Sequence, residues 1–399
     1  MHRRDFMRAG TAGALALLSA KLWAAAGDAK LLVVMLRGAY DGASLFVPYS
    51  SDFYYRSRPN IAVPRPDSGD PDAAVALDSD WALNAAVKDS LLPMYTSRQA
   101  VLIPFCGSDD LSRSHFQAQD LMELGQPGGG ALDYSSGYLN RLVEALATGA
   151  APSAVSFTGS LTPVFKGAVP VPNVSLRGNM KINIPPHQGE LIASLYEGTK
   201  LSGMATAGMA TKKMVSDELM NEMAESARGA GPARAFERQA RAIAKLMRDG
   251  PAYSVGFVDV GGWDTHVNQG SAQGALATNL GGLSGGLSAF AQEMGGLWRS
   301  TVVVVMSEFG RTFRENGNRG TDHGHGNTLW VLGGGISGGR IVGRRVAVSE
   351  ANLFQDRDYQ VLNDYRSVLA YLFSRMYGLG GTALDRVLPG AKPDNYGFA

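Results

Sequence analysis

The sequence is poor in cysteine and histidine, two residue types that often build disulfide frameworks and metal centres. Of its 399 residues, one is cysteine, Cys106, and six are histidine. A single cysteine excludes an intramolecular disulfide in any compartment. With so few histidines, a cluster of them calls for an explanation.

Concentrated positive charge is also missing. The 37 lysines and arginines nearly balance the 36 aspartates and glutamates, and no basic run follows the first few residues. Nucleic-acid binding needs a concentrated basic patch, so no nucleic-acid partner is expected. No later segment is long and apolar enough to cross a bilayer, so we expect no stable membrane span.

The N-terminus is expected to be a targeting segment. The charged stretch "MHRRDFMRAG" precedes small apolar residues that end in an alanine-rich stretch suited to cleavage, as in signal peptides. Arg3 and Arg4 look like a twin-arginine export signal, which would make the twin-arginine translocase a partner. The alternatives are an ordinary secretory signal or a membrane anchor, but the apolar run is short and Lys21 interrupts it.

We therefore expect residues 1–26 to be a twin-arginine signal peptide and residues 27–399 to form one domain. The twin-arginine route carries folded proteins, so a periplasmic or otherwise exported location is expected.

Glycine, by contrast, is abundant, with 50 residues in short runs that indicate tight loops. Between the loops, nearly continuous apolar runs predict strands covered on both faces, at residues 31–36, 100–105, 254–260, 301–306 and 328–333. Helical patterns alternate with them, at residues 115–124, 136–147, 232–247, 272–298 and 364–377. This alternation predicts an α/β fold with a mostly parallel central sheet and helices on both faces.

Polar motifs follow the predicted strands. The motif "RGAYDG" follows the first strand, "CGSDDLSRSH" the second, "GGWDTH" the third and "SEFGRT" the fourth. Ligands of open parallel sheets bind beyond the carboxyl ends of the strands. These four motifs and "DHGHG" at 322–326 are therefore expected to converge.

The motifs offer six oxygen or nitrogen ligands for a metal ion, namely Asp264, His266, Glu308, Asp322, His323 and His325. Mixed carboxylate and imidazole sets suit zinc, manganese or iron, so a divalent metal cofactor is predicted, with zinc or manganese the expected ion. The alternative is a polar crevice with hydrogen-bonded histidines. Asp41 in "YDG" is either a seventh ligand or a turn residue.

We expect His323 and His325 to face one crevice across Gly324, with Asp322 as a ligand or an orienting partner. Such a sharp turn would use positive φ at Gly324 and Gly326, which glycine tolerates.

Other polar residues could bind or attack a substrate. Ser112 and Ser114 precede a helical pattern that begins at His115, so they would lie at its positive end, where an anion is favoured. At least one of them is expected to cap the helix. Arg311 and Arg37 are candidate clamps for an oxyanion, or they pair with neighbouring carboxylates.

Several of these motifs together resemble the domain-of-unknown-function 1501 family of bacterial proteins, which usually carry twin-arginine signals. The segments are "LVVMLRGAYDGASLFVPY", "SRSHFQAQDLMELG", "GGWDTH", "MSEFGRTFRENGNRGTDHGHGN" and "DYRSVLA". That family is placed in the alkaline phosphatase-like superfamily, with sulfatases and cofactor-independent phosphoglycerate mutases. The resemblance implies a two-metal hydrolase fold and supplies no substrate.

The sequence departs from the wider superfamily at two places. Its phosphatases commonly carry Asp-His after the strand where this chain has Glu308 and Phe309. Its sulfatases need a modified Cys or Ser in a Cys-x-Pro-x-Arg-like motif, but here Gly107 follows Cys106, which argues against a formylglycine sulfatase. Ser112, or else Ser114, is the nearest match to the superfamily nucleophile.

The sequence thus predicts an exported metal-dependent hydrolase of a phosphate or sulfate ester, with an anionic small molecule or polymer as substrate. In this hypothesis Ser112 or Ser114 attacks and Arg311 or Arg37 holds the non-bridging oxygens. The alternative is a non-catalytic exported binding or assembly protein that keeps the superfamily scaffold.

Overall fold

A computed structural model describes residues 29–147, 153–176, 235–249 and 253–399. The predicted signal peptide, residues 1–26, lies outside the described residues, as do the first three residues of the helix predicted at 232–247.

The described residues contain one large sheet whose strand order is β10-β5-β9-β8-β1-β7-β6, with β11 pairing on β5. All of the predicted strands are present in it, each shifted by no more than two residues at either end. The strands of this sheet are β1 (Lys30–Leu36), β5 (Ala100–Gly107), β6 (Ser153–Ser156), β7 (Tyr253–Val260), β8 (Thr301–Ser307), β9 (Asn327–Gly333), β10 (Arg340–Ile341) and β11 (Asn363–Asp364).

Strand β9 runs opposite to the others. It pairs antiparallel with β5 and β8, whereas every other pair in this sheet is parallel. Its first residue, Asn327, therefore lies at the edge where the parallel strands end. This reversal brings "DHGHG", which precedes β9, to the same edge as the motifs that follow β1, β5, β7 and β8.

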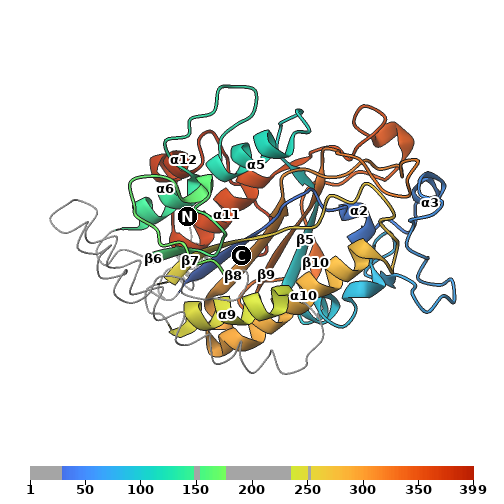
Figure 1. The fold of residues 1–399 in the computed structure, drawn as a ribbon, viewed down its shortest axis with the longest axis horizontal. Coiled ribbons are helices and arrows are strands. Elements are labelled where there is room, and N and C mark those ends of the chain that lie inside the picture. Colours follow the sequence, from blue (N-terminus) through green and yellow to red (C-terminus); the bar gives the residue numbers. More distant parts are fainter. Residues whose placement is uncertain (1–28, 148–152, 177–234, 250–252) are drawn as a thin grey trace, which may run out of the picture.

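Helices cover both faces of the sheet, which confirms the predicted fold class (Figure 1). Helices α9 and α10 lie on one face, and α5, α6, α11 and α12 lie on the other. The longer helices are α5 (His115–Leu124), α6 (Tyr138–Leu146), α9 (Ala235–Asp249), α10 (Ala275–Met294), α11 (Tyr365–Tyr377) and α12 (Gly381–Val387). The short ones are α2 (Gly42–Leu45), α3 (Asp52–Ser57), α4 (Leu91–Thr96) and the 3₁₀ turns η1 (Ala85–Val87), η2 (Pro163–Phe165), η3 (Gly295–Ser300) and η4 (Glu350–Asn352).

The two faces of the sheet bury separate apolar clusters. In β1, Leu32 and Val34 belong to the cluster under α9 and α10, and Leu31 and Val33 to the cluster under α6 and α11. Successive side chains of a strand point to opposite faces, so a strand buried on both sides must be apolar throughout. This is why the central strands show no alternation in the sequence.

A small antiparallel sheet lies outside the central one. It has the order β2-β4-β3, formed by Phe46–Val47, Ala82–Leu83 and Val75–Ala76.

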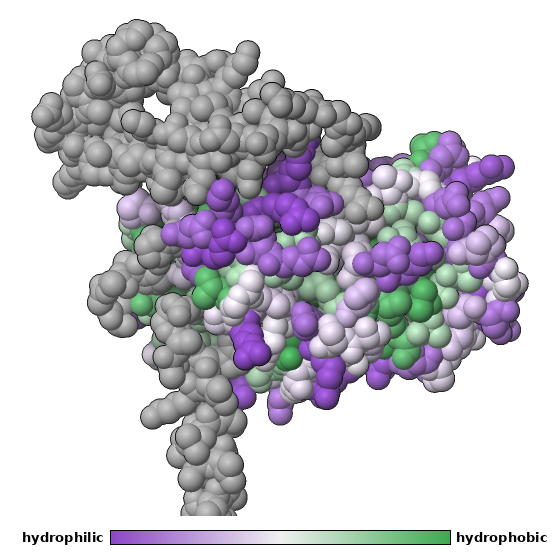
Figure 2. All heavy atoms as spheres, turned by 90° about the horizontal axis from the view of Figure 1, so that it is seen from below, coloured by the Kyte–Doolittle hydropathy of each residue, from purple (hydrophilic) through white to green (hydrophobic). Residues whose placement is uncertain are grey.

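Hydrophilic residues are spread over much of the face drawn in Figure 2, with smaller hydrophobic patches between them. Among the described residues, no helix combines the length and the apolar character needed to cross a membrane.

Candidate metal centre

Three histidine side chains meet at the edge where the parallel strands end. His266 follows β7, His323 precedes the reversed strand β9, and His115 begins α5 after the loop from β5. The Nε2 atom of His323 lies 3.0 Å from Nε2 of His115 and 3.1 Å from Nε2 of His266. Asp264 completes the cluster, with Oδ1 at 3.3 Å from His323 Nε2 and 2.9 Å from His266 Nε2.

The other nitrogen of each imidazole faces a hydrogen-bond acceptor. Nδ1 of His115 lies 2.8 Å from Glu308 Oε1, and Nδ1 of His266 lies 2.9 Å from Asp322 Oδ1. Nδ1 of His323 lies 3.0 Å from the backbone carbonyl oxygen of Arg113. A carbonyl or an ionised carboxylate can only accept, so each Nδ1 carries a hydrogen. In the neutral imidazoles the three Nε2 lone pairs therefore face one another.

Two such lone pairs repel at hydrogen-bond distance, and either a proton shared between the rings or a bound cation relieves that repulsion. Tetrahedral zinc, with Zn–N bonds of about 2.0–2.1 Å, holds neighbouring ligand atoms about 3.3 Å apart. The observed contacts are close to this spacing, and ligand atoms of His115, Asp264 and His323 all lie within 4.8 Å of one another. His266 joins them from the side of Asp264 Oδ1 and His323. The donors present thus fit a divalent transition-metal ion.

Electrostatics differ among the cluster residues. The hydrogen bond to Glu308 raises the pKa of His115, whereas burial lowers the pKa of His323 and favours the neutral form that binds metals. Burial acts to raise the pKa of Asp264, but Arg311 and the imidazoles outweigh it and hold that pKa below its usual value. The side chains stay open to solvent, from 20% exposed for His115 to 43% for Asp264.

Arg311 forms an ion pair with Asp264. Its Nη1 donates to Asp264 Oδ1 at 2.5 Å, Nε donates to Thr321 Oγ1 at 3.2 Å, and Nη2 donates to the carbonyl of Thr321. The guanidinium side chain is fully buried. Of the two alternatives left by the sequence, pairing with a carboxylate therefore holds, and the structure does not place Arg311 as an oxyanion clamp.

Arg37 is likewise paired. It contacts Glu123 Oε1 at 2.7 Å and Asp259 Oδ2 at 2.9 Å, and it donates to Gln119 at 2.8 Å. Gln119 in turn donates to Glu308 Oε1 at 2.8 Å. Arg37 therefore supports the cluster from outside and is not free to hold a substrate.

Two of the predicted ligands orient imidazoles. The buried Glu308 carboxylate accepts from His115, Gln119, Ser307 Oγ at 2.9 Å and the backbone N–H of Gly38 at 2.8 Å. Asp322 holds His266 and accepts from Asn316 at 3.0 Å. Carboxylates that fix metal-binding histidines in this way set the ring orientation and raise ligand basicity.

His325 is turned away from the cluster, contrary to expectation. Its ring packs on Phe354 with centroids 4.9 Å apart, and burial lowers its pKa. Neither Gly324 nor Gly326 has positive φ, so the expected sharp turn is absent. These glycines are needed for close packing, because a Cβ at Gly324 would lie 2.4 Å from the Arg311 carbonyl carbon and one at Gly326 would lie 2.2 Å from the Gln360 oxygen.

Asp41 lies apart from the cluster. It caps α2, and Arg58 donates to both of its oxygens, at 2.5 and 3.1 Å. Ser44 and Gln269 also donate to it, each at 2.7 Å. With its oxygens occupied by this buried network, Asp41 is placed as a turn and ion-pair residue, the second alternative for "YDG".

The two serines flank Arg113. Ser114 is the N-cap residue of α5 but makes no side-chain capping bond. Ser112 donates to Asp110 Oδ2 at 2.5 Å and accepts from the backbone N–H of Ser114 at 3.2 Å. Neither serine hydroxyl therefore caps α5, but both lie on the backbone whose carbonyl holds His323.

The place of His115 in the cluster is not evident from the sequence. Its neighbours "SRS" point to helix capping and anion binding. Only the position of α5 against Glu308 turns its ring into the cluster. The sequence feature that could have indicated its place is that His115 begins a predicted helix at the same sheet edge as His266 and His323.

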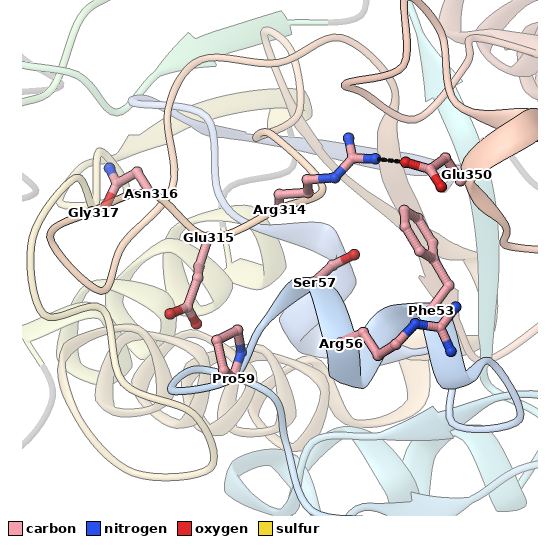
Figure 3. A pocket seen from close by; sticks show the side chains of 9 residues that line it. All are labelled: Phe53, Arg56, Ser57, Pro59, Arg314, Glu315, Asn316, Gly317 and Glu350. Atoms are coloured by element: carbon pink, nitrogen blue, oxygen red, sulfur yellow. Dashed lines mark hydrogen bonds and ion pairs between the residues drawn. The ribbon is translucent and has the colours of Figure 1, made fainter.

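Figure 3 shows a pocket of about 510 Å³ that is connected to the cluster through Asn316. Residues of α3 and of the 314–317 segment line it, and Arg314 and Glu350 pair across it at 2.5 Å. Asn316 belongs to the lining and also donates to Asp322. A molecule in this pocket would thus lie one residue from the pair of Asp322 and His266.

The chain shows distant likeness to several solved structures. Ps i-CgsB in complex with k-i-k-neocarrahexaose is 7% identical with a TM-score of 0.44, over 92% of this chain and 75% of that one. The lipoteichoic acid synthase LtaP from Listeria monocytogenes is 10% identical with a TM-score of 0.39, over 93% and 75%. The PsFucS1 sulfatase from Pseudoalteromonas sp. is 9% identical with a TM-score of 0.35, over 78% and 64%.

No curated protein matches the sequence. The model of one family, described as a protein of unknown function (DUF1501), matches residues 28–388. This match spans nearly the whole of the chain beyond the predicted signal peptide, including every residue of the cluster. The chain therefore belongs to the DUF1501 family.

Proposed function

We propose that the cluster binds one divalent metal ion, zinc or manganese, and that the protein is an exported hydrolase of a phosphate or sulfate ester. The observation that carries the proposal is the convergence of three imidazole Nε2 atoms on Asp264 at a solvent-exposed sheet edge. His115, His266, His323 and Asp264 would hold the ion. When bound, the ion supplies Lewis acidity toward an ester oxygen.

One ion is proposed because Arg311 already occupies Asp264 Oδ1 as a fixed cation. The superfamily resemblance implies two ions, but the carboxylates of Glu308 and Asp322 are used to orient His115 and His266. Elemental analysis of the purified protein should therefore give about one zinc or manganese per chain, and two per chain would contradict this assignment.

Substrate attack is assigned to Ser112. Its hydroxyl donates to the carboxylate of Asp110, which would accept the proton as Ser112 Oγ bonds to phosphorus or sulfur. The ester's bond to its alcohol would break, and the alcohol would leave with that proton. Water would then hydrolyse the serine ester, which releases phosphate or sulfate and restores the serine hydroxyl. The N-terminus of α5 lies beside it, where backbone N–H groups favour an anion.

Hydrolysis of a panel of phosphate and sulfate mono- and diesters tests the proposal, and no cleavage of any ester by metal-loaded protein would defeat it. Ser112→Ala should abolish turnover, with Ser114→Ala as the comparison.

A non-catalytic binding or assembly role is the second candidate. It is favoured by the commitment of both Arg37 and Arg311 to carboxylates, which leaves neither to clamp an anionic ester. Phe309 also occupies the place where superfamily phosphatases commonly carry histidine, with its ring 4.9 Å from that of His115. Stoichiometric metal without turnover on any ester would favour this role.

A further inference from the structure

The three imidazoles of the cluster are held in two different ways. His115 and His266 are oriented by the side-chain carboxylates of Glu308 and Asp322, but His323 is oriented by the backbone carbonyl of Arg113. A backbone carbonyl cannot rotate independently of its chain. The orientation of His323 therefore depends on the backbone conformation at Arg113.

That conformation is one that arginine disfavours. Arg113 has φ of 51°. In this left-handed region Cβ comes too close to the backbone carbonyl oxygen, and non-glycine residues stay there only where the surroundings enforce it. Some contact must therefore hold Arg113 in place.

The side chain of Arg113 supplies that contact. Its Nε and Nη2 donate to Asp358 Oδ2 at 3.1 and 2.7 Å, and Nη2 also donates to Gln355 at 2.8 Å. The Asp358 side chain is fully buried, whereas that of Arg113 is 25% exposed. A partly exposed arginine thus ties an exposed loop to a carboxylate inside the fold.

Asp358 is itself fixed to the strand segment beside His323. Its backbone forms a bridge with Thr312, whose N–H donates to the carbonyl of Asp322 at 2.9 Å. The contacts close a ring from Asp358 through Thr312 and the "DHGHG" segment to His323, then through Arg113 back to Asp358. Both partners of the hydrogen bond between His323 and Arg113 are therefore connected to Asp358.

We infer that Arg113 is a positioning residue for the metal centre and that its pair with Asp358 sets the ring orientation of His323. This inference rests on the metal centre proposed above. The anchored backbone also carries Ser112 and Ser114 on either side of Arg113, so the pair fixes the serines relative to the metal ligand. Loss of the pair should disturb both together.

The test compares Arg113→Ala and Arg113→Lys with Arg357→Ala. Arg357 contacts the same Asp358 oxygen at 3.3 Å and is 38% exposed, but it does not hold His323, which makes it a matched control. Affinity for Zn²⁺ and the visible spectrum of the Co²⁺ form report the centre. The ¹⁵N spectrum of histidine-labelled, metal-free protein reports which nitrogen of His323 carries the hydrogen.

Arg113→Ala should lower Zn²⁺ affinity about 10- to 100-fold, the typical range for changes behind a ligand. It should also change the Co²⁺ spectrum and convert His323 from the Nδ1–H form to a mixture of forms. Arg113→Lys should recover part of both effects, because one ammonium can reach Asp358 but cannot reproduce the fork of a guanidinium. Arg357→Ala should match the wild type.

Wild-type behaviour of Arg113→Ala would overturn the inference, as would equal losses in Arg357→Ala, since these would indicate a general effect of Asp358. If the wild type binds neither Zn²⁺ nor Co²⁺, the proposed function fails. The ¹⁵N spectra of the metal-free variants then test the inference alone. A mixture of His323 forms in Arg113→Ala, with the Nδ1–H form kept in Arg357→Ala, supports it, and the Nδ1–H form in both variants contradicts it.

Discussion

His323 and His325 lie two positions apart, yet their side chains have different surroundings. His323 contacts two other imidazoles, whereas His325 packs on Phe354. His323→Ala should therefore lower metal affinity by at least about 10-fold, because it removes a ligand and not merely an orienting group. His325→Ala should leave metal affinity near that of the wild type. Calorimetric titration with Zn²⁺ measures both affinities, and equal losses in the two variants would show that His325 is also a metal ligand.

Asp41 shows a second way in which a buried carboxylate is used. Its partner Arg58 is fully buried, so removing the negative charge would leave an unpaired guanidinium in the core. Asp41→Asn should lower the free energy of unfolding by about 3 to 5 kcal/mol, the range for breaking a buried pair. Asp52→Asn removes an exposed pair with Arg65 and should cost less than about 1 kcal/mol. Urea unfolding of metal-free protein measures both, and loss of metal binding by a stably folded Asp41→Asn protein would identify Asp41 as a ligand.

The same pair predicts how stability depends on pH. Burial acts to raise the pKa of Asp41, but Arg58 and the hydrogen bonds of Ser44 and Gln269 outweigh it, so the folded-state pKa lies below the usual value. A lowered folded pKa contributes stability that is complete above the unfolded pKa of about 3.9 and is lost as pH falls through the folded pKa. The stability gap between wild type and Asp41→Asn should therefore shrink in acid below about pH 4. Urea unfolding at several pH values checks this, and a gap that widens in acid would contradict the sign.

At the scale of elements, the sequence was enough to place the central strands and helices, because their apolar runs are long and bounded by glycine. It also grouped Asp264, His266 and His323, since strand ends converge in this class of fold. It could not show that β9 is reversed, because a strand buried on both faces has the same pattern in either direction. It could not separate ligands from orienting carboxylates, because Glu308 and His115 are 193 residues apart and meet only through the packing of α5.

The segment before β9 depends on glycines for reasons of space. A Cβ at Gly324 would lie 2.4 Å from a backbone carbon of Arg311, whereas one at Gly317, an exposed position nearby, would meet nothing within 4 Å. Gly324→Ala should therefore destabilise the protein by about 1 to 3 kcal/mol, as overpacking does, and weaken metal binding by displacing His323. Gly317→Ala should do neither. Thermal unfolding and Zn²⁺ titration of the two variants check this, and a Gly324→Ala protein with wild-type affinity would show that the segment can shift without moving His323.

In the whole molecule, the proposed metal centre takes its ligands from segments that span residues 115 to 323. No single segment holds all of them, so the proposed ion would bind only after the sheet has formed. Such a requirement suits the proposed twin-arginine route, which exports folded proteins.

Export is expected to depend on the two arginines of the predicted signal peptide. Replacing Arg3 and Arg4 with lysine should keep the protein in the cytoplasm, because the twin-arginine translocase reads that pair. The retained protein should be folded and should carry the proposed metal, since the substitutions lie outside the described residues that form the sheet and the cluster. Cell fractionation followed by elemental analysis of both forms measures location and metal together. Mature protein outside the cytoplasmic membrane despite both substitutions would show a different export route, and metal-free protein retained in the cytoplasm would show that the ion is acquired after export.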